Sequence, residues 1–163
     1  MKQENRFVAQ LFHYLAPFVD LNKNLFICVD GEAARNHAGT SPSAPEDRDV
    51  PDLWFSLLGQ DSPIGIEAKV IEGNSISVRQ GQLRAWRTDG GGKHKPTFWV
   101  ATNPELTNFY CWHQADMQRR LDASKSSVEN VKLSLADTRP AYQADSVAKL
   151  ALFILAKAIG TAG

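Results

Sequence analysis

The apolar run from Ile64 to Ile71 carries two charged side chains, Glu67 and Lys69, and this combination restricts the fold more than any other feature. The run is short, rich in isoleucine and bounded by turn residues, which is typical of a buried strand. Because side chains alternate between the faces of a strand, Glu67 and Lys69 share one face. Burying a charge there costs on the order of several kcal/mol unless a partner or an ion compensates it. The strand therefore needs compensating groups close by.

A second apolar run begins at Asp52 and ends at Leu58. Residues 59–62 separate the two runs and have the composition of a turn, which predicts an antiparallel hairpin with Asp52 and Glu67 at one sheet edge. Mg²⁺ prefers oxygen ligands and commonly takes a couple of carboxylates. The sequence therefore predicts a Mg²⁺ site at Asp52 and Glu67, with the carbonyl of Ala68 as a third ligand and Mn²⁺ as a substitute metal.

Lys69 adds a chemical function to this face. Phosphodiester hydrolysis needs charge on the phosphate, a reactive water and help for the departing oxygen, all of which a hard cation supplies. Lys69 would orient the water, lower its pKa or neutralise charge in the transition state. The pattern thus indicates metal-dependent cleavage of a nucleic acid. The alternative is a purely structural ion pair between Glu67 and Lys69.

The remaining pattern predicts an α/β fold in a single domain, residues 1–163. Helical periodicity is found over residues 3–16, 114–121 and 147–160. Short apolar runs predict further strands over 25–29, 97–102 and 109–112. Together these elements predict a mixed central sheet of about five strands, flanked by helices and followed by a C-terminal amphipathic helix. Residues 122–139 are polar and show only weak periodicity.

A Ser-x-x-Gln capping box, Ser77 to Gln80, predicts a second helix that runs to about Arg87. Five basic residues against one acid lie between positions 79 and 95: Arg79, Arg84, Arg87, Lys93 and Lys95. Gln80, Arg84 and Arg87 share one helical face, which predicts a track for a phosphate backbone. A merely solvated charged face is the alternative.

Eighteen basic and eighteen acidic residues give zero formal net charge, so attraction for nucleic acid must come from such a local patch. The two cysteines, Cys28 and Cys111, lie in apolar runs without zinc-ligand spacing, which predicts buried thiols in a reducing compartment. The first residues lack the apolar core of a signal peptide, and no run reaches the roughly 18 apolar residues that span a bilayer. A cytoplasmic protein without membrane contact is expected.

The chain resembles the PD-(D/E)xK nuclease superfamily in three segments: Val50-Pro51-Asp52-Leu53, Gly65-Ile66-Glu67-Ala68-Lys69 and Ser77-x-x-Gln80. Holliday junction resolvase and VRR-type nuclease domains are the most similar branches in style. The resemblance covers about residues 1–113 and leaves 114–163 as a helical extension. It implies a restriction-endonuclease-like core: a helix, a three-stranded antiparallel meander, a second helix and a further strand.

The resemblance also implies roles for individual residues. Asp52 and Glu67 would bind the metal, and Lys69 would be the catalytic lysine. Many members carry a glutamate on the first helix near the metal, and Glu4 is the only acid on that helix here. An ordinary first-turn acid, favoured by the helix dipole, is the alternative for Glu4.

Members of these branches also place a glutamine on the helix after the third strand. We favour Gln80 for this position, although Gln82, four residues before Trp86, fits the glutamine-then-aromatic pattern of exonuclease-like branches. Gln80 has a second interpretation, as a capping residue only. Trp86, beside the arginines, is a candidate platform for base stacking, and the alternative is a tryptophan of the core, which is the commoner role.

The sequence therefore predicts a Mg²⁺-dependent deoxyribonuclease that cuts phosphodiester bonds by attack of a metal-activated water. The resemblance allows a homodimer, because many such nucleases act as dimers. Two alternatives remain: a catalytically silent nucleic-acid-binding module of the same fold, and a protein-interaction subunit that uses the C-terminal helix. Metal-dependent cleavage would exclude the first, and salt-sensitive DNA binding would exclude the second as the sole role.

Overall fold

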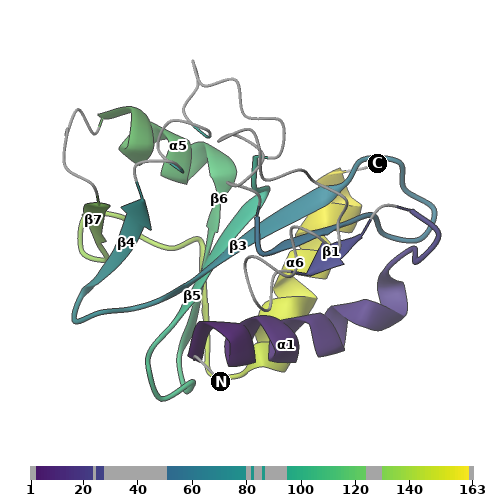
Figure 1. Ribbon diagram of the computed structural model, residues 1–163, viewed down its shortest axis with the longest axis horizontal. Coiled ribbons are helices and arrows are strands. Elements are labelled where there is room, and N and C mark those ends of the chain that lie inside the picture. Colours follow the sequence, from purple (N-terminus) through teal and green to yellow (C-terminus); the bar gives the residue numbers. More distant parts are fainter. Residues whose placement is uncertain are drawn as a thin grey trace, which may run out of the picture.

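The computed structural model describes residues 3–23, 25–27, 51–79, 82, 86, 95–123 and 130–161, which form an α/β fold (Figure 1). The elements follow in this order: α1 (Gln3–Leu15), the 3-10 helix η1 (Ala16–Phe18), β1 (Phe26–Ile27), β2 (Leu53–Phe55), β3 (Ile64–Val70), β4 (Ser75–Arg79), β5 (Phe98–Thr102), β6 (Phe109–His113), α5 (Gln114–Ala123), β7 (Asn130–Ser134), β8 (Tyr142–Ala144) and α6 (Val147–Thr161). The predicted fold class is confirmed, including the mixed sheet, its flanking helices and the C-terminal helix.

Six strands form the central sheet of the described residues, in the order β1-β2-β3-β5-β6-β8. The predicted hairpin is confirmed, because β2 pairs antiparallel with β3 and Leu53 lies opposite Ile66. β1 continues the antiparallel meander on the other side of β2. β3 and β5 run parallel, with Ile66 opposite Phe98, which makes the sheet mixed. The sheet has one strand more than expected, since β8 pairs with β6 at its edge.

Side-chain alternation along β3 divides the hydrophobic core into two clusters. Ile66 and Ala68 belong to the first cluster, which α1 and α6 cover. Trp99 and Ala101 lie opposite Glu67 and Lys69 and belong to the second cluster, which contains residues of α5, β4 and β7. Figure 1 shows α1 and α6 together on one side of the sheet, with α5, β4 and β7 on the other. Glu67 and Lys69 therefore point toward the second cluster.

The first and last helices bury the apolar stripes that their spacing predicted. The buried residues of α1 are Phe7, Val8, Leu11 and Leu15, and those of α6 are Val147, Leu150, Ala151, Ile154, Leu155 and Ala158. Ser146 caps α6, because its Oγ accepts a hydrogen bond of 3.2 Å from the backbone N–H of Lys149. Within the described residues, no helix combines the length and the apolar character that crossing a membrane requires.

The prediction of a helix beginning at Ser77 was wrong, because Ser75–Arg79 forms β4. This segment alternates polar and apolar residues, as a half-buried strand does, and it pairs with β7 in a separate two-stranded sheet. β7 lies within the polar segment 122–139, whose weak periodicity predicts no clear element. The first helical residue described after β4 is Gln82. Pairing with β7, which is distant in the sequence, therefore determines the structure of this segment rather than the local capping pattern.

One of the two cysteines can be placed. Cys111 is buried as a free thiol, as predicted. Burial raises the pKa of this thiol to about 12, so it stays protonated at neutral pH. Cys28 lies outside the described residues.

Candidate active site

Asp52 and Glu67 lie side by side on adjacent strands. Leu53 is opposite Ile66 in the β2–β3 register, so the next pair along the strands is Asp52 and Glu67. Directly opposed residues point to the same face of a sheet with their Cβ atoms about 5 Å apart. Both acids are buried, with exposed fractions of 9% for Asp52 and 3% for Glu67. The fold therefore brings together the two carboxylates that the sequence predicted as a pair.

Pro51 explains why the ladder between β2 and β3 stops beside these acids. By the same register Pro51 faces Ala68, but a proline has no N–H to donate to the Ala68 carbonyl. The Ala68 N–H donates instead to Oδ2 of Asp52, at 2.8 Å. The N–H and C=O of one strand residue point to the same neighbouring strand. The Ala68 carbonyl therefore points to the side of β3 on which Asp52 lies, where the predicted third metal ligand belongs.

The electrostatic environment of the two carboxylates is unfavourable for two negative charges. Burial raises the pKa of Asp52 well above its ordinary value, and the charges of Glu67 and Glu4 raise it further. Burial also raises the pKa of Glu67, against the opposing charge of Lys69. Oε2 of Glu67 is buried without a hydrogen-bond partner among the described residues. An orphaned carboxylate oxygen beside a second carboxylate is a donor set that fits Mg²⁺ or Mn²⁺.

Lys69 contacts Glu67 and Gln82 on the same face of β3. Its Nζ lies 3.5 Å from Oε1 of Glu67 and donates a hydrogen bond of 2.8 Å to Oε1 of Gln82. The ammonium group also lies 5.9 Å from the centre of the Trp99 ring, within range of a cation–π interaction. These contacts hold the ammonium beside the carboxylate pair, where it can orient a water molecule or offset negative charge.

Gln82 links the carboxylates, the lysine and the end of β4. Its Nε2 donates to Oε1 of Glu67 at 3.1 Å, and its Oε1 accepts from the backbone N–H of Arg79 at 3.2 Å. A glutamine that bonds the backbone three residues before it is the second half of a capping box. Gln82, which is only 3% exposed, therefore makes the contacts with Lys69 and Glu67 that are expected of a site glutamine, while the prediction for Gln80 is not tested. Gln80 itself lies outside the described residues.

The spacing of Gln82 and Trp86 is the sequence pattern that indicates Gln82. Gln82 and Trp86 are both helical and four residues apart, so they share one helical face. Trp86 is fully buried and packs edge-on against Trp99, with ring centres 5.5 Å apart. The interpretation of Trp86 as an exposed platform for base stacking was wrong. The tryptophan instead anchors the helix that carries Gln82 against the sheet.

Glu4 influences the site through its charge. It lies in the first turn of α1, and its charge raises the pKa of both Asp52 and Glu67. The described residues contain no group of three or more His, Cys, Asp or Glu side chains arranged to hold a metal ion. A metal at this site would therefore rely on two carboxylates, the Ala68 carbonyl, water and substrate, while direct ligation by Glu4 stays a prediction.

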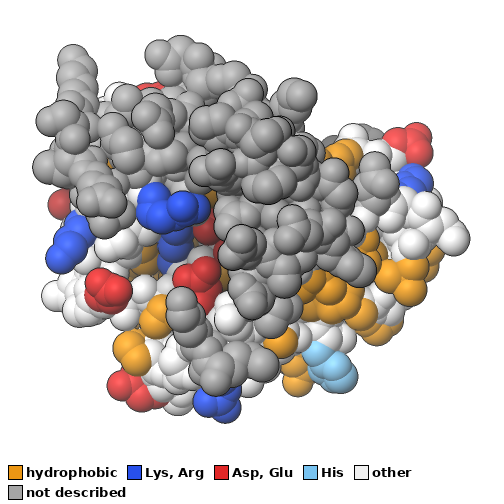
Figure 2. Space-filling view, in the orientation of Figure 1, with side chains coloured by type: hydrophobic (Ala, Val, Ile, Leu, Met, Phe, Trp, Pro, Cys, Tyr) orange, Lys and Arg blue, Asp and Glu red, His pale blue; other side chains and the backbone are white. Residues whose placement is uncertain are grey.

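The basic patch can be placed only in part. Arg79 is exposed at the end of β4, and Lys95 is half-buried before β5. The charge of Arg79 acts to lower the pKa of Glu67, against the larger effect of burial. Figure 2 shows acidic side chains next to basic ones between β4 and the start of α1. Arg84, Arg87 and Lys93 lie outside the described residues.

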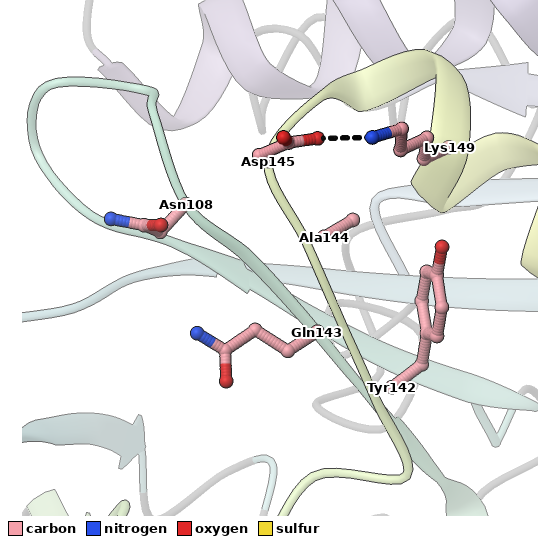
Figure 3. Close-up of a pocket in the computed structure, with 6 residues that line it drawn as sticks. All are labelled: Asn108, Tyr142, Gln143, Ala144, Asp145 and Lys149. Atoms are coloured by element: carbon pink, nitrogen blue, oxygen red, sulfur yellow. Dashed lines mark hydrogen bonds and ion pairs between the residues drawn. The ribbon is translucent and has the colours of Figure 1, made fainter.

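Two surface pockets lie away from the carboxylate pair. One, of about 520 Å³, is lined by Asn108, Tyr142, Gln143, Ala144, Asp145 and Lys149 at the β8 edge of the sheet (Figure 3). Asp145 and Lys149 form an ion pair of 2.8 Å on its rim. The other, of about 620 Å³, lies between α1 and the start of α6. Neither pocket includes a predicted site residue. We place the candidate site at Asp52, Glu67 and Lys69 because these side chains have the chemistry for metal binding and catalysis.

No protein-family model matches this chain, and no curated protein sequence matches it significantly.

Proposed function

We propose that this protein is a Mg²⁺-dependent nuclease that hydrolyses phosphodiester bonds of nucleic acid, with DNA as the favoured substrate. The observation that carries the proposal is the buried pair of Asp52 and Glu67, with Lys69 on the same face. Oε2 of Glu67 has no hydrogen-bond partner within the described part of the chain. The meander of β1, β2 and β3, and the parallel return to β5, support the resemblance to PD-(D/E)xK nucleases.

The balance of charge distinguishes this proposal from a structural ion pair. A single Lys69 would suffice to neutralise Glu67, but Asp52 is buried beside the same carboxylate and Glu4 adds further negative charge. Two buried carboxylates beside one ammonium leave an excess of negative charge, which costs stability unless a cation binds or a carboxyl takes up a proton. Such an arrangement is typical of a binding site rather than of a structural contact.

Each residue of the site would have a separate role. Asp52, Glu67 and the Ala68 carbonyl would hold Mg²⁺, which when bound supplies charge to the scissile phosphate and lowers the pKa of the nucleophilic water. Lys69 would donate a hydrogen bond to that water or to a phosphate oxygen, and its charge would offset the negative charge of the transition state. Gln82 would keep the ammonium in place through its 2.8 Å hydrogen bond.

Other aspects of the proposal rest on the sequence alone. We propose a cytoplasmic location because reduced thiols are expected. We propose a homodimer because many similar nucleases act as dimers. Substrate contacts from Arg79, Arg84, Arg87, Lys93 and Lys95 would go to phosphates, which favours recognition of nucleic-acid structure or ends over base sequence.

Cleavage assays test the proposal directly. Supercoiled plasmid and labelled duplex, branched and single-stranded DNA, with a matched RNA, are incubated with Mg²⁺, Mn²⁺ or a chelator. We expect metal-dependent cutting that falls by about 10²-fold or more in Asp52→Ala and Lys69→Ala. Lys149→Gln, at an exposed lysine on α6, serves as the control and keeps full activity.

Three results of these assays would contradict the proposed nuclease. Cutting that persists in Asp52→Ala would show a contaminating nuclease or a different site. Salt-sensitive DNA binding without any cutting would favour the catalytically silent module, and absence of both would favour the protein-interaction subunit. Circular dichroism of each variant establishes that loss of activity does not reflect loss of fold.

A further inference from the structure

The small sheet of β4 and β7 has one buried face and one outward face. Ile76, Val78 and Leu133 are buried in the second core cluster. The alternate positions point away from it: Ser75, Ser77, Arg79, Lys132 and Ser134. We call these five residues the ribbon face. Directly opposed residues of the two strands share a face, and Ser77 lies opposite Lys132.

Charge is distributed unevenly along the ribbon. The ribbon face itself carries two cations, Arg79 and Lys132, and no acid, and both cations are exposed. Two acids, Glu72 and Asp137, lie beyond the Ser75 and Ser134 ends of the two strands. A third acid, Glu129, precedes Asn130 in the sequence and lies outside the described residues. Among the described residues, the end of the ribbon face that carries Arg79 and Lys132 is therefore positive.

Small polar side chains between the cations leave this end accessible. The side chains of Ser77 and Lys132 make no hydrogen bond or ion pair in the described part of the chain, whereas the Ser75 and Ser134 hydroxyls bond locally. A diagonal pair across an antiparallel ladder, such as Arg79 and Lys132, is separated by about 7–8 Å. Two cations at that spacing, with a hydroxyl between them, suit successive groups of a linear polyanion.

The positive end of the ribbon adjoins the candidate active site. Arg79 is the last residue of β4, and its backbone N–H bonds the side chain of Gln82, which bonds Glu67 and Lys69 in turn. Figure 2 shows Lys and Arg side chains over β4 and β7, beside the acidic side chains near the start of α1. A chain whose scissile phosphate lies at Asp52 and Glu67 would thus reach the ribbon face at Arg79.

We propose that the ribbon face binds the phosphodiester backbone of the substrate nucleic acid, with Arg79 and Lys132 contacting phosphates and Ser77 donating a hydrogen bond between them. The inference rests on the proposed function, because the active site defines where the substrate chain begins. Phosphate contacts carry no base information, so this surface strengthens binding to all sequences and makes it dependent on salt.

Equilibrium binding of the full chain tests the inference separately from cleavage. A labelled DNA duplex and its single strand are titrated in chelator at several salt concentrations, with Lys132→Gln, Lys132→Glu and the control Lys149→Gln. For Lys132→Gln we expect roughly threefold to tenfold weaker binding, and a salt slope smaller by about 0.9 for the duplex or about 0.7 for the single strand. Lys132→Glu weakens binding further, and Lys149→Gln leaves it unchanged.

The results separate this inference from the proposed nuclease. If the intact protein cuts DNA but Lys132→Gln binds with the affinity and slope of the intact protein, the ribbon face is excluded while the nuclease stands. If DNA binds through Lys132 without being cut, the ribbon face is supported and the nuclease is not. If the intact protein neither binds nor cuts, both proposals fall. Because Lys132 is exposed, unchanged thermal unfolding of its variants is expected and is checked.

Discussion

Oδ2 of Asp52 lies 2.8 Å from the backbone nitrogen of Ala68 and accepts its hydrogen bond. Asp52 thereby takes the place that a backbone carbonyl of β2 would occupy in a continuous ladder. The bond holds one oxygen of the carboxylate in place. Asp52 is thus both a structural cap for the β3 ladder and a candidate metal ligand, and substitutions can separate these two roles.

Asp52→Asn should change stability and metal binding in opposite directions. Asparagine keeps an oxygen that accepts the Ala68 N–H, but it removes a buried charge that burial and Glu67 both disfavour. We expect the metal-free variant to be about 1 kcal/mol more stable than the natural protein at neutral pH, and to gain no stability from Mg²⁺. Urea unfolding with and without Mg²⁺ measures both effects. Equal Mg²⁺ stabilisation in the two proteins would exclude Asp52 as a ligand.

The pH dependence of stability should reveal the two raised pKa values. A carboxyl whose pKa is raised on folding binds its proton more tightly in the folded state, so its stabilising contribution is complete below the unfolded pKa. The ordinary values are 3.8 for Asp52 and 4.5 for Glu67. We therefore expect the free energy of unfolding of the metal-free protein to fall as pH rises from there through the raised pKa values.

Mg²⁺ should oppose this loss of stability. The ion binds the deprotonated carboxylates of the folded state, so its stabilising effect grows as pH rises through the same interval. Thermal unfolding from mildly acidic to neutral pH, with Mg²⁺ or with chelator, tests the expectation. Asp52→Asn is the control and should flatten both curves. A Mg²⁺ effect that is independent of pH would place the ion elsewhere.

Gln82→Ala should impair stability and cleavage together. The substitution removes bonds to Lys69, Glu67 and the Arg79 N–H, and leaves buried groups without partners. We expect a loss of about 1–3 kcal/mol and a fall in cleavage rate at saturating DNA, because the ammonium loses its anchor. Gln118→Ala is the matched control, since Gln118 bonds neighbours along α5 away from the site. Gln80→Ala is compared as well, and a larger loss of cleavage there would restore Gln80 as the site glutamine.

Gly65→Ala should displace Asp52 without touching any candidate ligand. A Cβ at position 65 would lie 3.0 Å from Cγ of Pro51 and 3.0 Å from the Trp54 ring, neither of which is the end of a flexible chain. We expect destabilisation by about 1–3 kcal/mol and weaker Mg²⁺ binding, because Pro51 must move away from β3. Gly160→Ala meets open space in α6 and should stabilise the protein by about 0.5–1 kcal/mol. Unchanged Mg²⁺ affinity in Gly65→Ala would show that Pro51 does not position Asp52.

Elements that depend on local patterns could be predicted from the amino-acid sequence alone. Period-two alternation placed Glu67 and Lys69 on one face of β3, and the turn at 59–62 paired that strand with Asp52. Helical spacing gave α1, α5 and α6 close to their observed bounds. These features follow from near neighbours in the chain, so a single sequence contains the information that specifies them.

Features that depend on distant partners became visible in the three-dimensional fold. Ser75–Arg79 became a strand because Asn130–Ser134 pairs with it, although the local pattern at Ser77 suggested a helix start. With Ser75–Arg79 in a strand, Gln82 hydrogen-bonds Lys69 and Glu67. The strand pairing also places Lys132 opposite Ser77. Contacts between segments so far apart arise from burial of the second core cluster, whose members no short window of sequence brings together.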